Sequence, residues 1–164
     1  MRALTSFGTD ESVRRAVTAY SRMLLRLAMT RLPSSADAED VVQEVFLKLL
    51  TARPQFRDAE HEKAWLIRAT LHRACDMARS AERRNLPLEA AEAVPGGELP
   101  EPSPILSAVQ ALPAKYSAVI HLYYYEGYSI KEISQLLRLP VPTVGTRLSR
   151  GRERLRELLK EDVE

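Results

Sequence analysis

The sequence predicts an all-α protein made of two small helical domains joined by a flexible linker. Apolar residues recur at spacings of three and four along most of the chain, which is the period of amphipathic helices. A stretch rich in proline and glycine, residues 85–103, interrupts this pattern and separates residues 1–84 from residues 104–164. A chain of 164 residues is long enough for two such domains.

The composition is that of a globular protein of a reducing compartment. Hydrophobic residues make up 45% of the chain, which is enough to build a core, and charged residues make up 28%. No apolar run approaches the roughly 18 residues of a membrane span, and the N-terminus has no apolar signal-peptide segment. Cys75 is the only cysteine, so an internal disulfide is excluded and we expect a cytoplasmic protein.

The first two helices are expected over residues 10–31 and 36–52, with a break at the Leu-Pro-Ser-Ser segment 32–35. The apolar face of the first helix consists of Val13, Val17, Tyr20, Leu24 and Leu27. That of the second consists of Val41, Val42, Val45, Phe46, Leu49 and Leu50. Outside this second face lie Asp37, Asp40, Gln43, Glu44 and Lys48. Acidic residues also favour the first turn of a helix electrostatically, so these residues have a structural as well as a functional interpretation.

A polar loop over residues 53–62 with one aromatic, Phe56, precedes a long helix expected over residues 63–84. Its inner side carries Ile67, Leu71, Ala74, Ala78 and Ala81. Another side carries Arg68, His72, Arg79 and Arg83, with Trp65 at the head of the row. A basic row led by an aromatic suits unpaired nucleic acid, because bases stack on rings while arginines contact phosphates. For Trp65 alone, the favoured interpretation is a core residue.

The expected linker, residues 85–103, carries four glutamates and no basic residue. The second domain begins near Pro104 with a helix that stops at Pro113, and a further helix continues to Glu126-Gly127. The tyrosine run 123–125 lies on this helix, and we expect it to pack against the following segment rather than to stack on bases.

The last segment, residues 128–159, reads as two helices joined by a sharp turn. Ser129 and Glu132 form a capping box, and Ile130, Ile133, Leu136 and Leu137 form an apolar face. Leu139-Pro140 ends this helix, and Pro142 suits the first position of the next one. The expected buried stripe of the last helix is Val144, Leu148, Leu155 and Leu158/Leu159, and its free faces carry Thr143, Thr146, Arg147, Arg150 and Arg154.

Two short helices at a tight turn indicate a helix-turn-helix, which places its second helix in the DNA major groove. The alternative is a helical hairpin with a solvated basic face. Six arginines against two glutamates between Arg138 and Glu157 favour a phosphate-bearing partner.

With these residues in place, the chain resembles the bacterial sigma factors of the sigma-70 family, extracytoplasmic-function (ECF) type. AEDVVQEVFLKLL matches the family's acidic D-x-x-Q-E-x-F helix, and AWLIRATLHRACDMARSAERR matches its promoter-melting helix. ALPAKYSAVIHLYYYEGYSIKEISQLLRLPVPTVGTRLSRGRERL is similar to its second DNA-reading domain. The resemblance implies a region 2-like domain over residues 1–84 and a region 4-like domain over residues 104–164.

The resemblance also implies partners and sites. Core RNA polymerase would bind through its large-subunit clamp coiled coil, on Asp40, Gln43, Glu44 and Lys48, and through its flap. The promoter −10 element would meet Phe56, Trp65, Arg68, His72, Arg79 and Arg83, with residues 56–62 and the start of the following helix as the candidate pocket for an extruded base. The −35 element would meet Thr143, Thr146, Arg147, Arg150 and Arg154. An anti-sigma factor is a partner that the family often has. Four residues depart from the family's usual types: His72 (usually Asn), Ser117 (Arg), Pro142 (Gly) and Gly145 (Lys or another long polar residue).

We expect no catalytic residue, cofactor or metal. The Gly96-Gly97 pair lacks the Lys-Ser/Thr sequel of a phosphate loop. His72 and Cys75 make half a metal site that His61 and His121 do not complete. Two other functions remain open at this point: an autonomous helix-turn-helix regulator that binds operators as a dimer, and the adaptor subunit of a nuclease.

Overall fold

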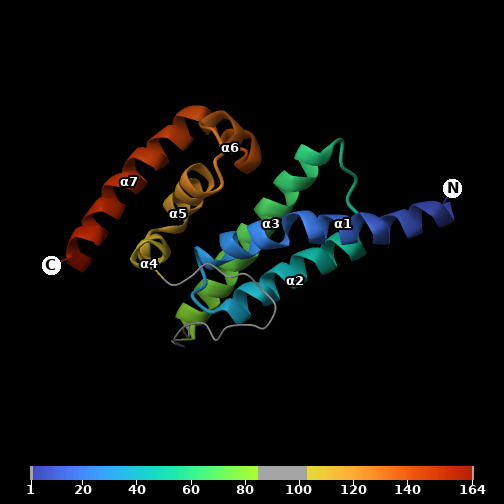
Figure 1. The fold of residues 1–164 in the computed structure, drawn as a ribbon, viewed down its shortest axis with the longest axis horizontal. Coiled ribbons are helices and arrows are strands. Elements are labelled where there is room, and N and C mark those ends of the chain that lie inside the picture. The colour runs from blue at the N-terminus through green and yellow to red at the C-terminus, as the bar shows by residue number, and fades with distance from the viewer. Residues whose placement is uncertain (1, 85–102, 164) are drawn as a thin grey trace.

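The computed structural model describes residues 2–84 and 103–163, with side chains described over 11–84 and 103–160. Every regular element in these ranges is a helix, which confirms the predicted all-α class (Figure 1). Figure 1 shows the three N-terminal helices grouped on one side and the C-terminal helices on the other, with the two chain ends at opposite extremes. No helix in the described ranges combines the length and apolar character that crossing a membrane requires.

The N-terminal domain consists of α1 (Arg2–Met29), α2 (Ser35–Ala52) and α3 (Ala59–Arg83), and each helix contacts the other two. Ser34 caps α2 by accepting a 3.2 Å hydrogen bond from the main-chain N–H of Asp37. Asp58 caps α3 in the same way, at 2.8 Å from the N–H of His61. This cap starts α3 four residues before the predicted Lys63, so residues 59–62 belong to the helix and not to the loop. The first helix begins earlier than predicted and ends at Met29 instead of Arg31.

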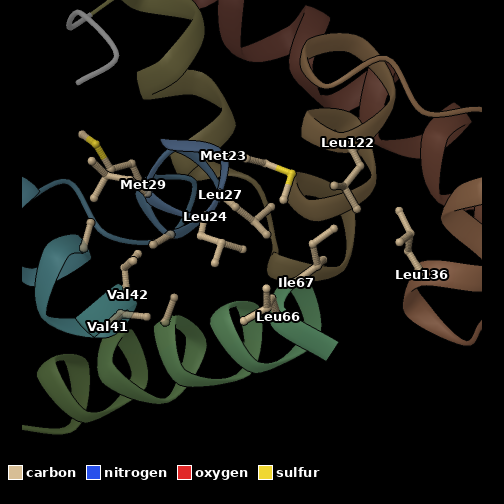
Figure 2. Close-up of a cluster of buried hydrophobic side chains, with 14 of the residues drawn as sticks. Met23, Leu24, Leu27, Met29, Val41, Val42, Leu66, Ile67, Leu122 and Leu136 are labelled. Carbon is tan, nitrogen blue, oxygen red and sulfur yellow. The ribbon is translucent and has the colours of Figure 1, made fainter. Parts of the chain in front are cut away.

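The N-terminal core lies between these three helices (Figure 2). Its largest fully buried side chains are Leu24, Leu27, Leu32, Val41, Leu66 and Ile67. One residue of the predicted face of α1 is misplaced, because Val17 is 38% exposed while the adjacent Ala16 is buried. At this point of α1 the residue that packs into the core is therefore Ala16, one position before the predicted Val17.

The C-terminal domain consists of α4 (Pro104–Ala111), α5 (Ala114–Ile120), the π-helical turn η1 (His121–Tyr125), α6 (Ile130–Leu137) and α7 (Val141–Val163). Ser103, predicted as the last linker residue, caps α4 by accepting a 3.0 Å hydrogen bond from Leu106 N–H. The rest of the predicted linker, residues 85–102, lies outside the described ranges. Instead of the continuous α-helix expected up to Glu126, the chain widens into a π turn, closed by a 3.1 Å bond from Glu126 N–H to the His121 carbonyl.

The helix-turn-helix predicted near the C-terminus is present. Ser129 and Glu132 form the capping box, with reciprocal hydrogen bonds of 3.0 and 3.1 Å. After α6, Arg138 adopts a left-handed conformation (φ 56°) that turns the chain toward α7. Helix α7 begins at Val141, so Pro142 is its second residue, whereas the sequence predicted it as the first.

The predicted buried stripe of α7 is only partly buried. Val144 and Leu148 are enclosed, whereas Leu155, Leu158 and Leu159 are half-buried.

The two domains pack against each other. Helix α3 contacts α6, and Leu122 and Leu136 of the C-terminal domain join the same buried cluster as Met23, Leu27 and Ile67. Figure 2 shows Leu122 and Leu136 facing Met23 and Ile67 across the boundary. The sequence pattern predicted two domains but gave no sign that they share a core.

Candidate functional surfaces

The first candidate surface is the outer face of α2. Asp40, Gln43, Glu44 and Lys48 are all exposed there, because they lie opposite the buried face of the helix. Asp37 is only half-exposed, next to the Ser34 cap. The surface therefore presents two carboxylates, an amide and an ammonium group within about two and a half turns of helix.

Glu44 has a partner that sequence patterns did not reveal. Arg73 of α3 donates from Nε to a carboxylate oxygen of Glu44 at 2.5 Å. This hydrogen bond is the main reason that the pKa of Arg73 is raised. Both side chains remain more than 40% exposed, so the pair contributes little to stability, and it serves to hold the Glu44 carboxylate in place.

The second candidate surface is the basic row of α3. Its residues lie in two different environments, one exposed to solvent and one against the C-terminal domain. His72, Arg79 and Arg83 are exposed, and Asp76 pairs with two of them: with His72 at 3.5 Å and with Arg79. The hydrogen bond from Arg79 is the main cause that lowers the pKa of Asp76. Arg68 does not share this solvent-facing position. It is half-buried and points toward the C-terminal domain.

An aromatic cluster lies at the head of α3. The ring of Phe56 meets those of His61 and Trp65 edge-on, with centroid distances of 5.3 and 5.9 Å. Trp65 is half-buried and packs against the core, in line with the favoured interpretation from sequence. The main-chain N–H of Arg57 donates to His61 Nδ1 at 3.1 Å, which fixes the loop to the first turn of α3.

Next to this cluster is a cavity of about 550 Å³ between α1, the end of α2 and the loop. Its lining includes Phe56 and the polar side chains of Gln55, Asp58 and Glu62. Burial raises the pKa of Glu62. An aromatic wall with polar groups around it is the combination that holds a planar base by stacking and by hydrogen bonds to its edge.

The third candidate surface is the N-terminal half of α7. Thr146, Arg150 and Arg154 are exposed, and Thr143 and Arg147 are partly exposed, so none of these predicted DNA contacts packs inward. All except Arg154 line a shallow hollow of about 280 Å³. The guanidinium of Arg154 instead lies 5.1 Å from the ring centroid of Tyr116.

Lys115 also lines this hollow, from the start of α5. Its side chain adds a cation to the surface made by α7. Sequence reasoning missed this residue because it lies far from the arginines in the chain, and no periodic pattern links the two helices.

The tyrosine run of η1 follows its prediction only in part. Tyr124 and Tyr125 are 54% and 63% exposed. Tyr124 does contact the helix-turn-helix, since its hydroxyl accepts a 3.0 Å hydrogen bond from Arg152 on α7. Tyr125 instead stacks on His121 and lies 5.3 Å from the guanidinium of Arg26 on α1.

An apolar groove of about 630 Å³ runs between α4, η1 and the C-terminal half of α7. Its lining includes Ile105, which is 61% exposed, Leu155 and the side chains of Arg152 and Arg156. The groove was not predicted from the sequence.

A partly buried ion pair joins the two domains. Arg26 donates from Nε and Nη2 to the two carboxylate oxygens of Glu126, at 3.2 and 3.0 Å. The same carboxylate lies 2.7 Å from Nε2 of His121, and the Glu126 side chain is 8% exposed. Burial opposes the charged form of Glu126, but the hydrogen bonds with His121 and Arg26 outweigh it, so the pKa of Glu126 is lowered.

Two more arginines of the N-terminal domain bind main-chain carbonyls of the C-terminal domain. Arg31 donates to the carbonyls of Gln110 and Leu112, at 2.9 and 2.5 Å. Arg68 donates to the carbonyl of Leu136 at 2.9 Å. These carbonyls lie near the ends of α4 and α6, where main-chain acceptors have no partner inside the helix.

Two models of one protein family match this chain, one in each domain. Residues 16–84 match the family model Sigma-70 region 2, and residues 103–155 match the model Sigma-70, region 4. The ECF RNA polymerase sigma factor SigW of Bacillus subtilis is 29% identical over an alignment that covers 94% of this chain and 92% of that protein.

Two solved structures share the fold. The sigma factor RpoE in complex with the anti-sigma factor NepR, from Bartonella quintana, superposes with a TM-score of 0.72 at 22% identity, over 92% of this chain and 98% of that one. CnrH in complex with the cytosolic domain of CnrY superposes with a TM-score of 0.69 at 25% identity, over 98% and 95%.

Proposed function

This chain belongs to the sigma-70 family of RNA polymerase sigma factors and is of the ECF type, and from that premise we propose which of its surfaces meet polymerase and which meet promoter DNA. As a sigma factor it binds core RNA polymerase and directs it to promoters. Two features support this proposal: the order of the two matched regions along the chain, and the charged face that each of them exposes. The region 2 match contains the exposed acidic face of α2, and the region 4 match contains the exposed basic face of α7.

The outer face of α2 is the proposed docking site for the clamp coiled coil of the large polymerase subunit. Asp40 and Glu44 are one turn apart and exposed, so a basic partner surface can contact both at once. Gln43 and Lys48 extend the same face. At the rim of this face, Arg73 binds the carboxylate of Glu44 and so fixes the position of one of the two acidic groups.

The loop and α3 are the proposed −10 surface. Arg79 and Arg83 provide cations for the phosphates of a separated strand, and His72 is exposed on the same helix as a polar contact. The cavity beside Phe56 receives an extruded base, with Trp65 supporting the aromatic wall. Extrusion of a base costs a few kcal/mol, and stacking in the pocket offsets part of that cost.

The N-terminal half of α7 is the proposed −35 surface. Thr143, Thr146, Arg147, Arg150 and Arg154 face outward, as a recognition helix in the major groove requires. A good bidentate contact between an arginine and a guanine discriminates by about 1–3 kcal/mol. Lys115 adds a contact suited to the phosphate backbone beside the groove.

We propose two further contacts from the family, one with polymerase and one with another protein. The apolar groove between α4 and α7 is our candidate for the contact with the polymerase flap. An anti-sigma factor is the second, since RpoE, which shares this fold, was solved in complex with the anti-sigma factor NepR. Because the protein acts together with RNA polymerase, we propose that it works in the bacterial cytoplasm and carries out no catalytic step of its own.

A stand-alone regulator that binds operators as a dimer is not favoured, because it would have no use for the region 2 domain. Reconstituted transcription tests the proposal. Core polymerase mixed with this chain should initiate RNA synthesis on a subset of genomic promoters, and the 5′ ends of the RNAs would give the −10 and −35 sequences.

The docking variant is Asp40→Lys combined with Glu44→Lys, and its matched control is Glu11→Lys combined with Glu157→Lys, which changes the net charge equally at exposed positions elsewhere. The docking variant should lose polymerase binding while the control keeps it. Retained binding by the docking variant would contradict the assignment of α2.

A further inference from the structure

One apolar side chain lies in the middle of the proposed docking face of α2. Leu47 is 59% exposed, and it is the one exposed leucine among those whose side chains the structure describes. A single exposed apolar residue has by itself no functional meaning, because much of any protein surface is apolar. The place of Leu47 on the helix is what distinguishes it.

Leu47 lies on the side of α2 that faces away from the core. Val45 and Leu49, two residues before and two residues after it, are both buried. Two residues of α-helix correspond to a rotation of about 200°, so the Leu47 side chain leaves the helix nearly opposite to both. Leu47 therefore belongs to the surface of its domain and not to the buried cluster.

Polar side chains surround Leu47 on this surface. Its helical neighbours at spacings of one, three and four residues are all exposed, and they are Gln43, Glu44, Lys48 and Thr51. Asp40 lies on the same face, two turns before Leu47. An apolar centre inside a polar rim is typical of the few residues that contribute most to the affinity of a protein interface, because the rim excludes water from the centre.

Two groups of this rim are held in position in the free protein. Arg73 of α3 donates a hydrogen bond to the Glu44 carboxylate at 2.5 Å. The Thr51 hydroxyl donates to the main-chain carbonyl of Leu47 at 3.0 Å. Side chains that are already ordered lose less conformational entropy when a partner binds. The surroundings of Leu47 are therefore suited to a protein contact.

The charge of α2 indicates which kind of partner fits. The helix carries four carboxylates and one ammonium group. A second copy of this chain would bring the same acidic helix to the contact, and like charges oppose association. A segment with an apolar hollow and basic side chains beside it complements the face instead. Leu47 would fill the hollow, while the basic groups would meet Asp40 and Glu44.

We propose that Leu47 is the apolar anchor of the docking surface, and that the clamp coiled coil of RNA polymerase receives it in an apolar hollow flanked by cations. The inference rests on the proposed function, because the charged residues of α2 define where polymerase docks. The carboxylates of the face direct the approach of the two proteins by electrostatic attraction. Removal of Leu47 from water then stabilises the complex once it has formed.

The affinity of the full-length chain for core polymerase measures the contribution of Leu47. Leu47→Ala should weaken binding about tenfold or more. Because the lost contact carries no charge, the dependence of the affinity on salt concentration should stay that of the wild type. Leu47→Met conserves the volume of the side chain and should bind almost as well as the wild type. Val17→Ala, at an exposed apolar position of α1, is the matched control and should keep full affinity.

Two further readouts separate a contact with polymerase from an effect on the fold. The urea midpoint of Leu47→Ala should equal that of the wild type, because the side chain lies outside the core. A photoreactive amino acid in place of Leu47 should crosslink to the large polymerase subunit. The same amino acid in place of Val17 should not.

Wild-type affinity of Leu47→Ala would overturn the proposal, and so would a loss of affinity that is accompanied by a lower urea midpoint. Sedimentation of the free chain tests the other occupant of the face. A dimer that Leu47→Ala dissociates would assign the leucine to a contact between copies and would also overturn the proposal.

The charge-reversed chain with Asp40→Lys and Glu44→Lys distinguishes this inference from the proposed function. If charge reversal abolishes binding while Leu47→Ala does not, α2 docks through its charges alone and only the role of Leu47 is refuted. If the charge-reversed chain binds polymerase normally, the assignment of α2 fails, and the role of Leu47 fails with it.

Discussion

The Arg68 guanidinium donates a 2.9 Å hydrogen bond to the main-chain carbonyl of Leu136 and so joins the first half of α3 to the last turn of α6. A cation at a helix C-terminus is stabilised by the exposed carbonyls and by the negative end of the helix dipole. Burial, and after it the charge of Arg138, lowers the pKa of Arg68. One side chain thus connects the proposed −10 surface with the domain that carries the −35 surface, although 68 residues separate the two in the chain.

Arg147→Ala and Arg150→Ala should each weaken binding of holoenzyme to −35 DNA. A lost base contact should cost about 1–3 kcal/mol and relax specificity at one position. A lost phosphate contact should act on all sequences and reduce the slope of log K against log salt by about 1. Filter binding at several salt concentrations distinguishes the two. Lys160→Ala, near the far end of the same helix, is the control.

Gly145→Lys should strengthen binding of the −35 element. The position lies on α7 beside the proposed contacts, and a Cβ there would meet no atom within 4 Å. One added phosphate contact should increase the salt slope by about 1. Gly145→Ala controls for the effect of removing the glycine, so equal affinities of the two variants would contradict the prediction.

Phe56→Ala should impair strand opening more than polymerase binding. The ring forms a wall of the proposed base pocket, and base stacking on an aromatic contributes about 1–3 kcal/mol. Fluorescence of 2-aminopurine placed in the −10 element reports opening directly. Val17→Ala, at an exposed apolar residue on another helix, should leave opening unchanged.

The two glycines of α7 should respond differently to alanine. Gly145→Ala should raise the free energy of unfolding by about 1 kcal/mol, since alanine favours a helix and the site is open. At Gly151 the added Cβ would lie 3.0 Å from a side-chain carbon of Ile120 and 3.3 Å from the Cβ of Tyr116, so these side chains would have to move by a few tenths of an ångström. Gly151→Ala should therefore show less gain or a loss, which urea denaturation of both variants would measure.

The Arg26–Glu126 contact should weaken in acid. The pKa of Glu126 is lower in the folded protein than its ordinary value of 4.5. Its stabilising contribution is therefore complete above that value and is lost as the pH falls through the folded pKa. Glu126→Gln should destabilise the protein at pH 7 and narrow the difference in stability between pH 7 and pH 3, measured by denaturant titration. An equal pH dependence in both proteins would contradict the prediction.

Local chemistry was predictable where neighbouring residues determine it. The capping box of Ser129 and Glu132 and the exposed face of α2 follow from short-range spacing, and both are present. The residues at which helices begin and end were predicted less accurately. Asp58, for example, caps α3 ahead of the expected start.

Features that join distant residues were not predictable. Arg26 and Glu126 are 100 residues apart, and no periodic pattern relates them. The same holds for Arg73 beside Glu44 and for Lys115 beside the arginines of α7. The basic row of α3 looked uniform in the sequence, but the second domain removes Arg68 from it.

The π turn at residues 121–125 accommodates about one residue more than an ordinary α-helical turn would. Deletion of one residue there would let the segment relax into an α-helix and would leave the chain after it in nearly the same direction. Insertion of a further residue into a regular helical turn would instead rotate everything after it by about 100° and would carry Glu126 away from Arg26. We infer that this short segment tolerates the loss of a single residue far better than the gain of one.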